Sequence, residues 1–235
     1  MDGHEIGNFK MDDSNTTSQT HCTRCGECCR RSSPTLQMQD LPFGKNPLLQ
    51  WSHLYTVRTG EPVKNNIDGN LEQTKQEIVK VREKAGKTAC LFYDDEEKEC
   101  AIYKHRPVQC AAQACWDESE FFRVYAAPKA TRKDIIRDEN LLRLVSEHEK
   151  RCSYSQLDQW AKRIEIDGNK AVEKILSLLK FDHDLRGMVL KKLRLDPTEL
   201  DFVFGRPLTK TISMFGLKLM KEKDGSFFLT ISEPL

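Results

Sequence analysis

The sequence lacks the marks of a secreted or membrane protein. Its first twenty residues contain no apolar run of the kind that forms a signal peptide. No later stretch approaches the roughly 18 consecutive apolar residues that a membrane-spanning helix requires. These absences predict a cytoplasmic protein without a membrane segment.

The chain also lacks an excess of charge of either sign. It has 37 Lys and Arg against 36 Asp and Glu, for a net charge of +1. No overall field exists to attract a polyanion or an anionic lipid surface, so nucleic acid is not an expected partner. A glycine-rich strand-to-helix turn for a nucleotide-like cofactor is missing as well.

Cysteine, by contrast, is abundant. The chain has nine cysteines, an odd count in a sequence with no secretion signal. Reducing compartments keep such thiols free, which makes metal ligation a better interpretation than a set of disulfides. The alternative to metal ligation or disulfides is that the free cysteines serve only as small buried apolar residues.

Four of the cysteines lie close together near the N-terminus. Cys22, Cys25, Cys28 and Cys29 form the pattern C-x2-C-x2-C-C. Gaps of two residues let a tight loop turn successive thiolates toward one centre. Adjacent side chains point in different directions in an extended chain, so Cys28 and Cys29 are hard to place on one tetrahedral ion. They suggest two metals or a polynuclear cluster.

A second group of four follows. Its spacing is wide, with nine residues between Cys90 and Cys100 and again nine between Cys100 and Cys110, before Cys115 completes the set. On a continuous helix Cys110 and Cys115 would lie roughly 140° apart, so either the helix ends between them or they serve different centres. Four plus four cysteines permit two complete four-thiolate sites.

Other residues are weaker candidates. Cys152 has no other cysteine at a spacing typical of metal ligands, and we interpret it as a buried or incidental thiol. His21 and His105 lie beside cysteine motifs but form no ligand pattern of their own. Thiolates accumulate negative charge, and nearby cations would offset it. These cations are Arg24, Arg30, Arg31, Lys104 and Arg106.

The cysteine order resembles that of the YkgJ-type cysteine-cluster family of zinc- or iron-chelating domains. The matching stretches are CTRCGECC, CLFYDDEEKEC and CAIYKHRPVQCAAQAC, with Tyr103, Arg106 and Pro107 in the family's places. The resemblance spans residues 22–116 and implies a metal site formed by all eight cysteines. A similar motif occurs in flagellin lysine N-methylases, which makes a protein-modifying enzyme conceivable.

The metal and its use stay open at this point. Three cysteines at two-residue spacing with a remote fourth resemble the wrapping of an iron–sulfur cluster, whereas the wide second group fits neither a ferredoxin run nor a zinc ribbon. A metal-binding protein with a structural, chaperoning or redox role is the first hypothesis. An iron- or iron–sulfur-dependent enzyme, with Tyr103, His105 or Asp117 as acid or base, and a zinc module that docks protein or nucleic acid are the alternatives.

The remaining pattern predicts an α+β protein. Residues 1–20 are polar and predict a disordered tail, residues 21–152 a small cysteine-rich metal-binding domain with short strands and a helix that begins at Pro107, and residues 153–235 a mainly helical part. The helical spacing of apolar residues in AVEKILSLL and LRGMVLKKL supports the last assignment. Two apolar runs around a Lys-Asp-Gly turn predict a terminal hairpin.

Overall fold

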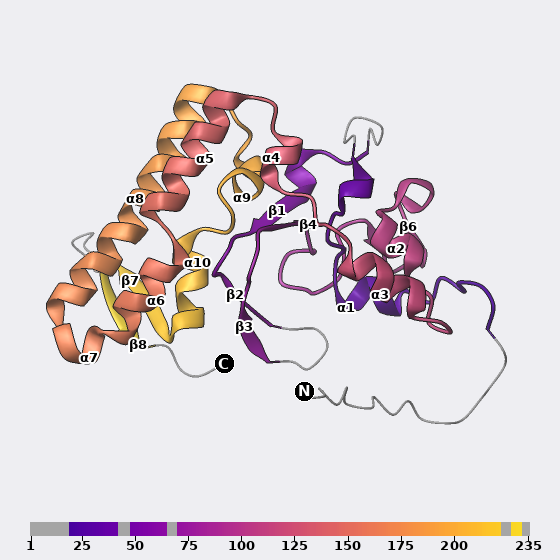
Figure 1. Cartoon of the computed structure of the whole chain (residues 1–235), viewed down its shortest axis with the longest axis horizontal. Coiled ribbons are helices and arrows are strands. Elements are labelled where there is room, and N and C mark those ends of the chain that lie inside the picture. The colour runs from indigo at the N-terminus through magenta and orange to yellow at the C-terminus, as the bar shows by residue number, and fades with distance from the viewer. Residues whose placement is uncertain (1–18, 42–47, 65–69, 222–226, 232–235) are drawn as a thin grey trace, which may run out of the picture.

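The computed structural model describes residues 19–41, 48–64, 70–221 and 227–231. Short antiparallel strand pairs and short helices make up the cysteine-rich half, and longer helices with a terminal hairpin make up the rest (Figure 1). The predicted α+β class is therefore confirmed. The predicted disordered tail falls almost wholly outside the described residues, as does the Lys-Asp-Gly turn of the hairpin. No described helix combines the length and the apolar character needed to cross a membrane.

The described strands pair two by two, each pair antiparallel. The pairs are β1 (Leu54–Val57) with β4 (Ile78–Val81), β2 (Pro62–Lys64) with β3 (Leu71–Gln73), β5 (Tyr93–Asp94) with β6 (Glu99–Cys100), and β7 (Leu217–Lys221) with β8 (Phe227–Ile231). The apolar alternation in Ile78–Val81 forms β4, with Val79 and Val81 buried. Strands β1 and β2 are separate because the chain reverses at Gly60, whose φ is +79°.

Short helices connect the strands of the cysteine-rich half, and α1 (Glu27–Arg31), α2 (Val108–Ala112) and α3 (Ser119–Ala126) lie together at the right of Figure 1. Each is only one or two turns long, so none presents a long apolar face and their placement depends on tertiary contacts. They are α1 (Glu27–Arg31), η1 (Met38–Asp40), η3 (Trp51–His53), η4 (Tyr103–His105), α2 (Val108–Ala112) and α3 (Ser119–Ala126).

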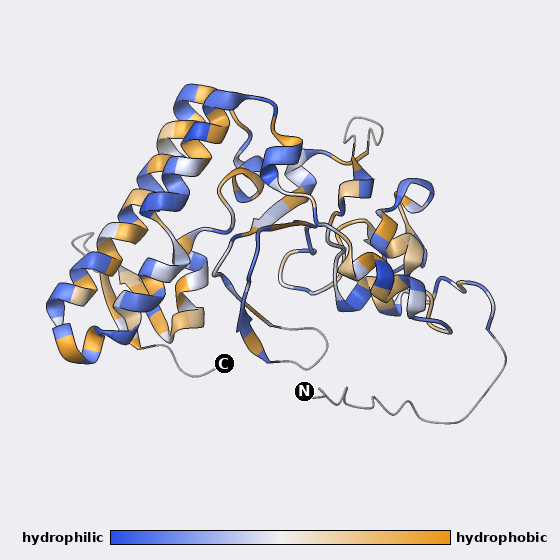
Figure 2. Ribbon diagram, viewed as in Figure 1, coloured by the Kyte–Doolittle hydropathy of each residue, from blue (hydrophilic) through white to orange (hydrophobic). Residues whose placement is uncertain are grey.

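The C-terminal half is dominated by one long helix, α8, which covers Asn169–Leu193. Its buried positions Ala171, Ile175 and Leu179 recur at the helical interval, and Figure 2 shows hydrophobic and hydrophilic residues alternating along it. The other elements here are α4 (Arg132–Ile135), α5 (Glu139–Arg151), α6 (Tyr154–Lys162), α7 (Ile164–Asp167), η5 (Pro197–Glu199), α9 (Leu200–Val203), α10 (Leu208–Thr211) and η6 (Ile212–Phe215).

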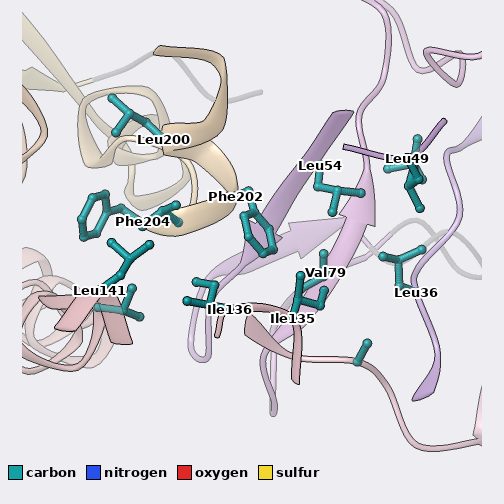
Figure 3. Packing of buried hydrophobic residues seen from close by; sticks show 14 of the residues in the cluster. Leu36, Leu49, Leu54, Val79, Ile135, Ile136, Leu141, Leu200, Phe202 and Phe204 are labelled. Carbon is teal, nitrogen blue, oxygen red and sulfur yellow. The ribbon is translucent and has the colours of Figure 1, made fainter. Parts of the chain in front are cut away.

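One hydrophobic core joins both halves of the chain. Leu54 and Val79 of the β1–β4 pair pack with Ile136, Phe202 and other buried residues from the helical half (Figure 3). A second cluster lies among α6, α8, α10 and β7. The shared core means that the strands behind the cysteine region are held by apolar contacts with α9 as well as by their own pairing.

A buried ionic network lies beside this core. Glu149 of α5 accepts bonds from Arg58 Nε and Nη2, at 2.7 and 2.9 Å, and from Arg132 Nη2 at 2.7 Å. Arg132 also pairs with Glu77 and donates to the carbonyl of Val203. Both guanidinium groups are essentially inaccessible to solvent, so the carboxylates and carbonyls around them are obligatory partners.

Candidate metal centre

The first cysteine run lies in a tight loop that leads into α1. Gly26 precedes the helix with a left-handed φ of +81°, which turns the chain between Cys25 and the Cys28–Cys29 pair. The ring of Tyr93 in β5 packs directly against this glycine. The glycine is therefore required both by its backbone conformation and by the space above it.

Cys28 and Cys29 point in more similar directions than an extended chain would allow. Both lie in α1, where consecutive residues differ by about 100°, and their Sγ atoms are 3.9 Å apart. Two thiolates on one tetrahedral zinc, with bonds of about 2.3 Å, are separated by roughly 3.8 Å. The expected difficulty of placing both sulfurs on one ion assumed an extended backbone; the helix brings them close enough to share one ion or to join two neighbouring ones.

The two thiols share a hydrogen bond that favours a thiolate on Cys28. Hydrogen bonding to the Cys29 thiol lowers the pKa of Cys28 to about 6, even though burial acts in the opposite direction. The same hydrogen bond, together with burial, raises the pKa of Cys29. The shared hydrogen bond thus acts on the pKa values of the two thiols in opposite directions.

Cys90 and Cys100 reach the same place from the β5–β6 region. The backbone N–H of Cys90 donates to the carbonyl of Cys29 at 2.8 Å, across 60 intervening residues. Cys100 is paired across the ribbon with Tyr93, whose hydroxyl accepts a bond from Arg30 at 3.3 Å. The exposed acidic turn predicted at residues 94–99 is the link between these two strands.

Cys110 and Cys115 complete the group. Cys110 lies in α2, which begins directly after Pro107 as predicted, and the helix ends at Ala112 before Cys115 is reached. The spacing of Cys110 and Cys115 left open whether one helix carries both; in the structure the helix ends between them.

The electrostatic surroundings of the thiols show which cysteines are neighbours. Burial raises the pKa of Cys110, and the thiols of Cys90, Cys28 and Cys100 raise it further. Burial also raises the pKa of Cys29, where Cys110 and Cys100 act with Cys28. The two cysteine groups of the sequence therefore share one region of the molecule.

Cys115 has a different set of neighbours. After burial, the influences that raise the pKa of its thiol come from Cys28, Cys25 and Cys22. These neighbours all belong to the N-terminal run. Cys28 is thus close both to Cys115 and to Cys110, which lies in α2.

The thiols are close together without forming a finished ligand set. Among the residues that the structure describes, no three His, Cys, Asp or Glu side chains converge in the manner of a metal site. A donor set of thiols alone suits zinc, iron or an iron–sulfur cluster, which are the centres that proteins bind through cysteine. The composition of the group fits such a metal.

Cations from both cysteine segments meet over one aromatic ring. The guanidinium groups of Arg24 and Arg106 lie 4.5 and 4.0 Å from the ring centroid of Tyr103, and Arg106 also donates to the Tyr103 carbonyl at 2.8 Å. The charge of Arg106 lowers the pKa of Cys100 and Cys110 against the larger effect of burial. Arg24 has a left-handed φ of +58°, so the stack holds a strained loop.

The other three candidate cations differ in how they contact the cysteine region. Arg30 donates to the carbonyl of Cys25 at 3.0 Å and pairs with Glu27. Arg31 and Lys104 are exposed. The structure therefore singles out Arg24, Arg106 and Arg30 among the five cations near the cysteines.

Cys152 and the two histidines behave differently from the eight cysteines. Cys152 lies in the helical half, is fully buried and donates weakly to the carbonyl of Leu178 at 3.7 Å, so it is a buried thiol as interpreted. His21 and His105 are both exposed at the edge of the cysteine region.

The proposed acid and base groups are occupied by structural contacts. Tyr103 is covered by two guanidinium groups, and the Asp117 carboxylate accepts a bond from the backbone N–H of Ser119 at 3.0 Å. An open pocket of about 320 Å³ lies between the β2–β3 pair, α6 and η6, and no cysteine lines it.

Comparison with known proteins agrees with the geometry. The family model described as "CxxCxxCC: Putative zinc- or iron-chelating domain" matches residues 21–129, a segment that contains all eight cysteines and ends directly after α3. No curated protein and no solved structure matches the chain significantly.

Proposed function

We propose that this protein binds zinc or iron through eight cysteine thiolates, since residues 21–129 match the family model described as a "putative zinc- or iron-chelating domain". The proposed ligands are Cys22, Cys25, Cys28, Cys29, Cys90, Cys100, Cys110 and Cys115. The observation that carries the proposal is the backbone hydrogen bond of 2.8 Å between Cys90 and Cys29, which brings the two cysteine groups of the sequence together across 60 residues.

The chemistry of the site favours a cation. Burial and the neighbouring thiols raise the pKa of Cys29, Cys90, Cys100 and Cys110, so the metal-free thiols are mostly protonated. A bound metal ion supplies the positive charge that holds such thiols as thiolates. Arg106 offsets part of the remaining negative charge from the side of Tyr103.

The role that the contacts support is a metal-dependent brace. A metal that links Cys29 to Cys90 closes a loop of 60 residues. Chain-entropy scaling gives about 4 kcal/mol for such a link, against a total stability of about 5 to 15 kcal/mol for a folded protein. The β5–β6 pair and α1 are short and depend on few backbone bonds of their own. Metal binding would fix them to each other.

Elemental analysis tests the proposal. Anaerobically purified protein is expected to contain zinc or iron in stoichiometric amount, and acid-labile sulfide with broad visible absorption would identify the iron–sulfur form. A variant with Cys25, Cys90 and Cys110 changed to serine should lose the metal, whereas Cys152→Ser should retain it. A wild-type protein that neither contains nor takes up zinc or iron would refute the proposal.

A further inference from the structure

The eight cysteines divide into two equal sets by exposure. Cys90 is buried, and three others are half-buried; the remaining four are exposed. The inner set is Cys29, Cys90, Cys100 and Cys110, and the outer set is Cys22, Cys25, Cys28 and Cys115. Each set has the four thiols that a complete tetrahedral thiolate site needs.

The inner set lies on backbone that is held from several sides. Cys90 is bonded through its N–H to Cys29, and Cys100 lies in the β5–β6 pair. Helix α2, which carries Cys110, is fixed because the N–H of Val108 donates to the Asp40 carboxylate at 2.9 Å. These ligands come from four separate segments that already meet in the fold.

The outer set lies on the loop before α1, on the first turn of α1 and on the turn that follows α2. The neighbours of Cys115 are Cys28, Cys25 and Cys22, all from the N-terminal run. The backbone of this loop passes through left-handed conformations at Arg24 and Gly26. The side-chain contact of Arg24 with Tyr103 attaches the loop to the body of the domain.

We infer that the chain builds two adjacent thiolate centres, an enclosed one on the inner set and a solvent-facing one on the outer set, each for one zinc or ferrous ion. This inference rests on the proposed function and adds to it the division of the ligands. The Cys28–Cys29 pair, with sulfurs 3.9 Å apart, is where the two centres meet. The thiolates of each centre add negative charge beside the other centre, and the guanidinium groups of Arg106 and Arg30 lie near enough to offset part of it.

The two centres would exchange their ions at different rates. A chelator or thiol must enter the coordination sphere to remove an ion, and the protein around a site controls that access. The outer ion is open to such attack, whereas the inner ion is shielded by α2 and the β5–β6 pair. The enclosed ion would brace the fold, and the outer ion would be the one that the protein can give up.

Zinc release from the full chain tests the division. Metal-free protein, reduced and then loaded with zinc, is expected to hold two zinc ions per chain and to release them to a chromophoric chelator in two phases of equal size. Cys28→Ser should remove the fast phase and leave the slow one, and its neighbour Cys29→Ser should do the reverse. Cys152→Ser is the control and should keep both phases.

The outcomes separate this inference from the proposed function. One zinc per chain, or release in a single phase, would overturn the division and leave metal binding intact. Loss of the same phase in Cys28→Ser and in Cys29→Ser would likewise overturn the division and leave metal binding intact. If Cys29→Ser does not fold by circular dichroism, Cys25→Ser and Cys115→Ser decide, because both must lose the fast phase alone. A wild-type chain that binds no zinc and no iron would overturn both claims.

Discussion

The hydroxyl group of Tyr93 occupies the space that a Cβ atom would need at Gly26. The glycine lies between the second and third cysteines of the N-terminal run, and the tyrosine lies in β5, between Cys90 and Cys100. The contact therefore fixes how closely the loop that carries one cysteine group approaches the strand between two cysteines of the other.

Gly26→Ala should weaken both the fold and metal binding. A side chain at a φ of +81° costs roughly 1–2 kcal/mol, and overlap with the Tyr93 ring adds about 1–3 kcal/mol. Gly216→Ala is the matched control, since Gly216 has a φ of +72° but no atom near its missing side chain. Chemical denaturation and zinc content measure the effect; equal losses in the two variants would contradict the role of Tyr93.

Tyr103→Leu should loosen the N-terminal loop, because it removes the ring on which Arg24 and Arg106 stack. Each exposed cation–π contact is worth about 0.5–1 kcal/mol, so faster zinc release with little change in overall stability is expected. Tyr103→Phe keeps the ring and should behave as wild type. If the phenylalanine variant released zinc as fast as the leucine variant, the hydroxyl and not the stack would matter.

Glu149→Gln should be strongly destabilising. The change removes the charge that neutralises Arg58 and helps neutralise Arg132, both of which remain buried, and the expected loss is about 3 kcal/mol of unfolding free energy. Glu147→Gln, on the same helix but in exposed pairs, should cost less than about 0.5 kcal/mol. Urea unfolding of the two variants compares them directly; similar values would show that the buried network contributes little.

Acid should destabilise the metal-free protein through Asp182. Burial alone would raise the pKa of this carboxyl group, but the bond from His148 at 2.7 Å, the charge of Arg186 and the N–H of Leu208 lower it to about 2. Its folded pKa is below the ordinary value, so the stability it contributes is present above pH about 4 and is lost as the pH falls toward 2. The difference corresponds to about 2 kcal/mol.

Unfolding free energies measured across this pH range check the prediction. Asp182→Asn should be less stable at neutral pH and should show a flatter acid dependence than wild type. Where that variant does not fold, the carboxyl titration of Asp182 can be followed by NMR in the wild-type chain. A carboxyl pKa at or above the ordinary value near 4 would be inconsistent with the buried pairing.

Metal removal should loosen the cysteine region without unfolding everything between Cys22 and Cys115. The long ligand spacing by itself suggests that chelation unfolds this whole segment. However, Leu54 and Val79 lie in the core shared with Phe202, so β1 and β4 should keep their protection. Hydrogen exchange before and after chelation is expected to rise in α1, β5, β6 and α2. Unchanged exchange there, with an unchanged melting curve, would show that the metal has no structural role.

Local patterns in the sequence predicted many of the elements. The Asp196–Glu199 capping box, the start of α2 after Pro107 and the spacing of buried residues in α8 all depend on neighbours within a few positions. The two cysteine groups could be recognised from their order alone. The closeness of the Cys28 and Cys29 sulfurs could not be read from the sequence, because the direction of adjacent side chains depends on whether the backbone is helical, and a helix of five residues leaves little periodic signal.

The buried network could not be read from the sequence. Arg58, Arg132 and Glu149 are far apart in the chain, and each resembles an ordinary surface charge in its local context. Their burial follows from the packing of α4 and α5 beside β1, which no short pattern records. The same holds for Tyr93 above Gly26.

The sequence alone determined that eight thiols of this protein lie in two groups with the order of a chelating domain, because ligand type and spacing are local properties. Only the tertiary structure decided which thiols are neighbours and which are open to solvent. Cys90 reaches Cys29 through a backbone bond across 60 residues, and Cys115 approaches the N-terminal run only because α2 ends at Ala112. Proximity between distant segments is set by packing and chain reversal, and the linear spacing of cysteines carries no record of either.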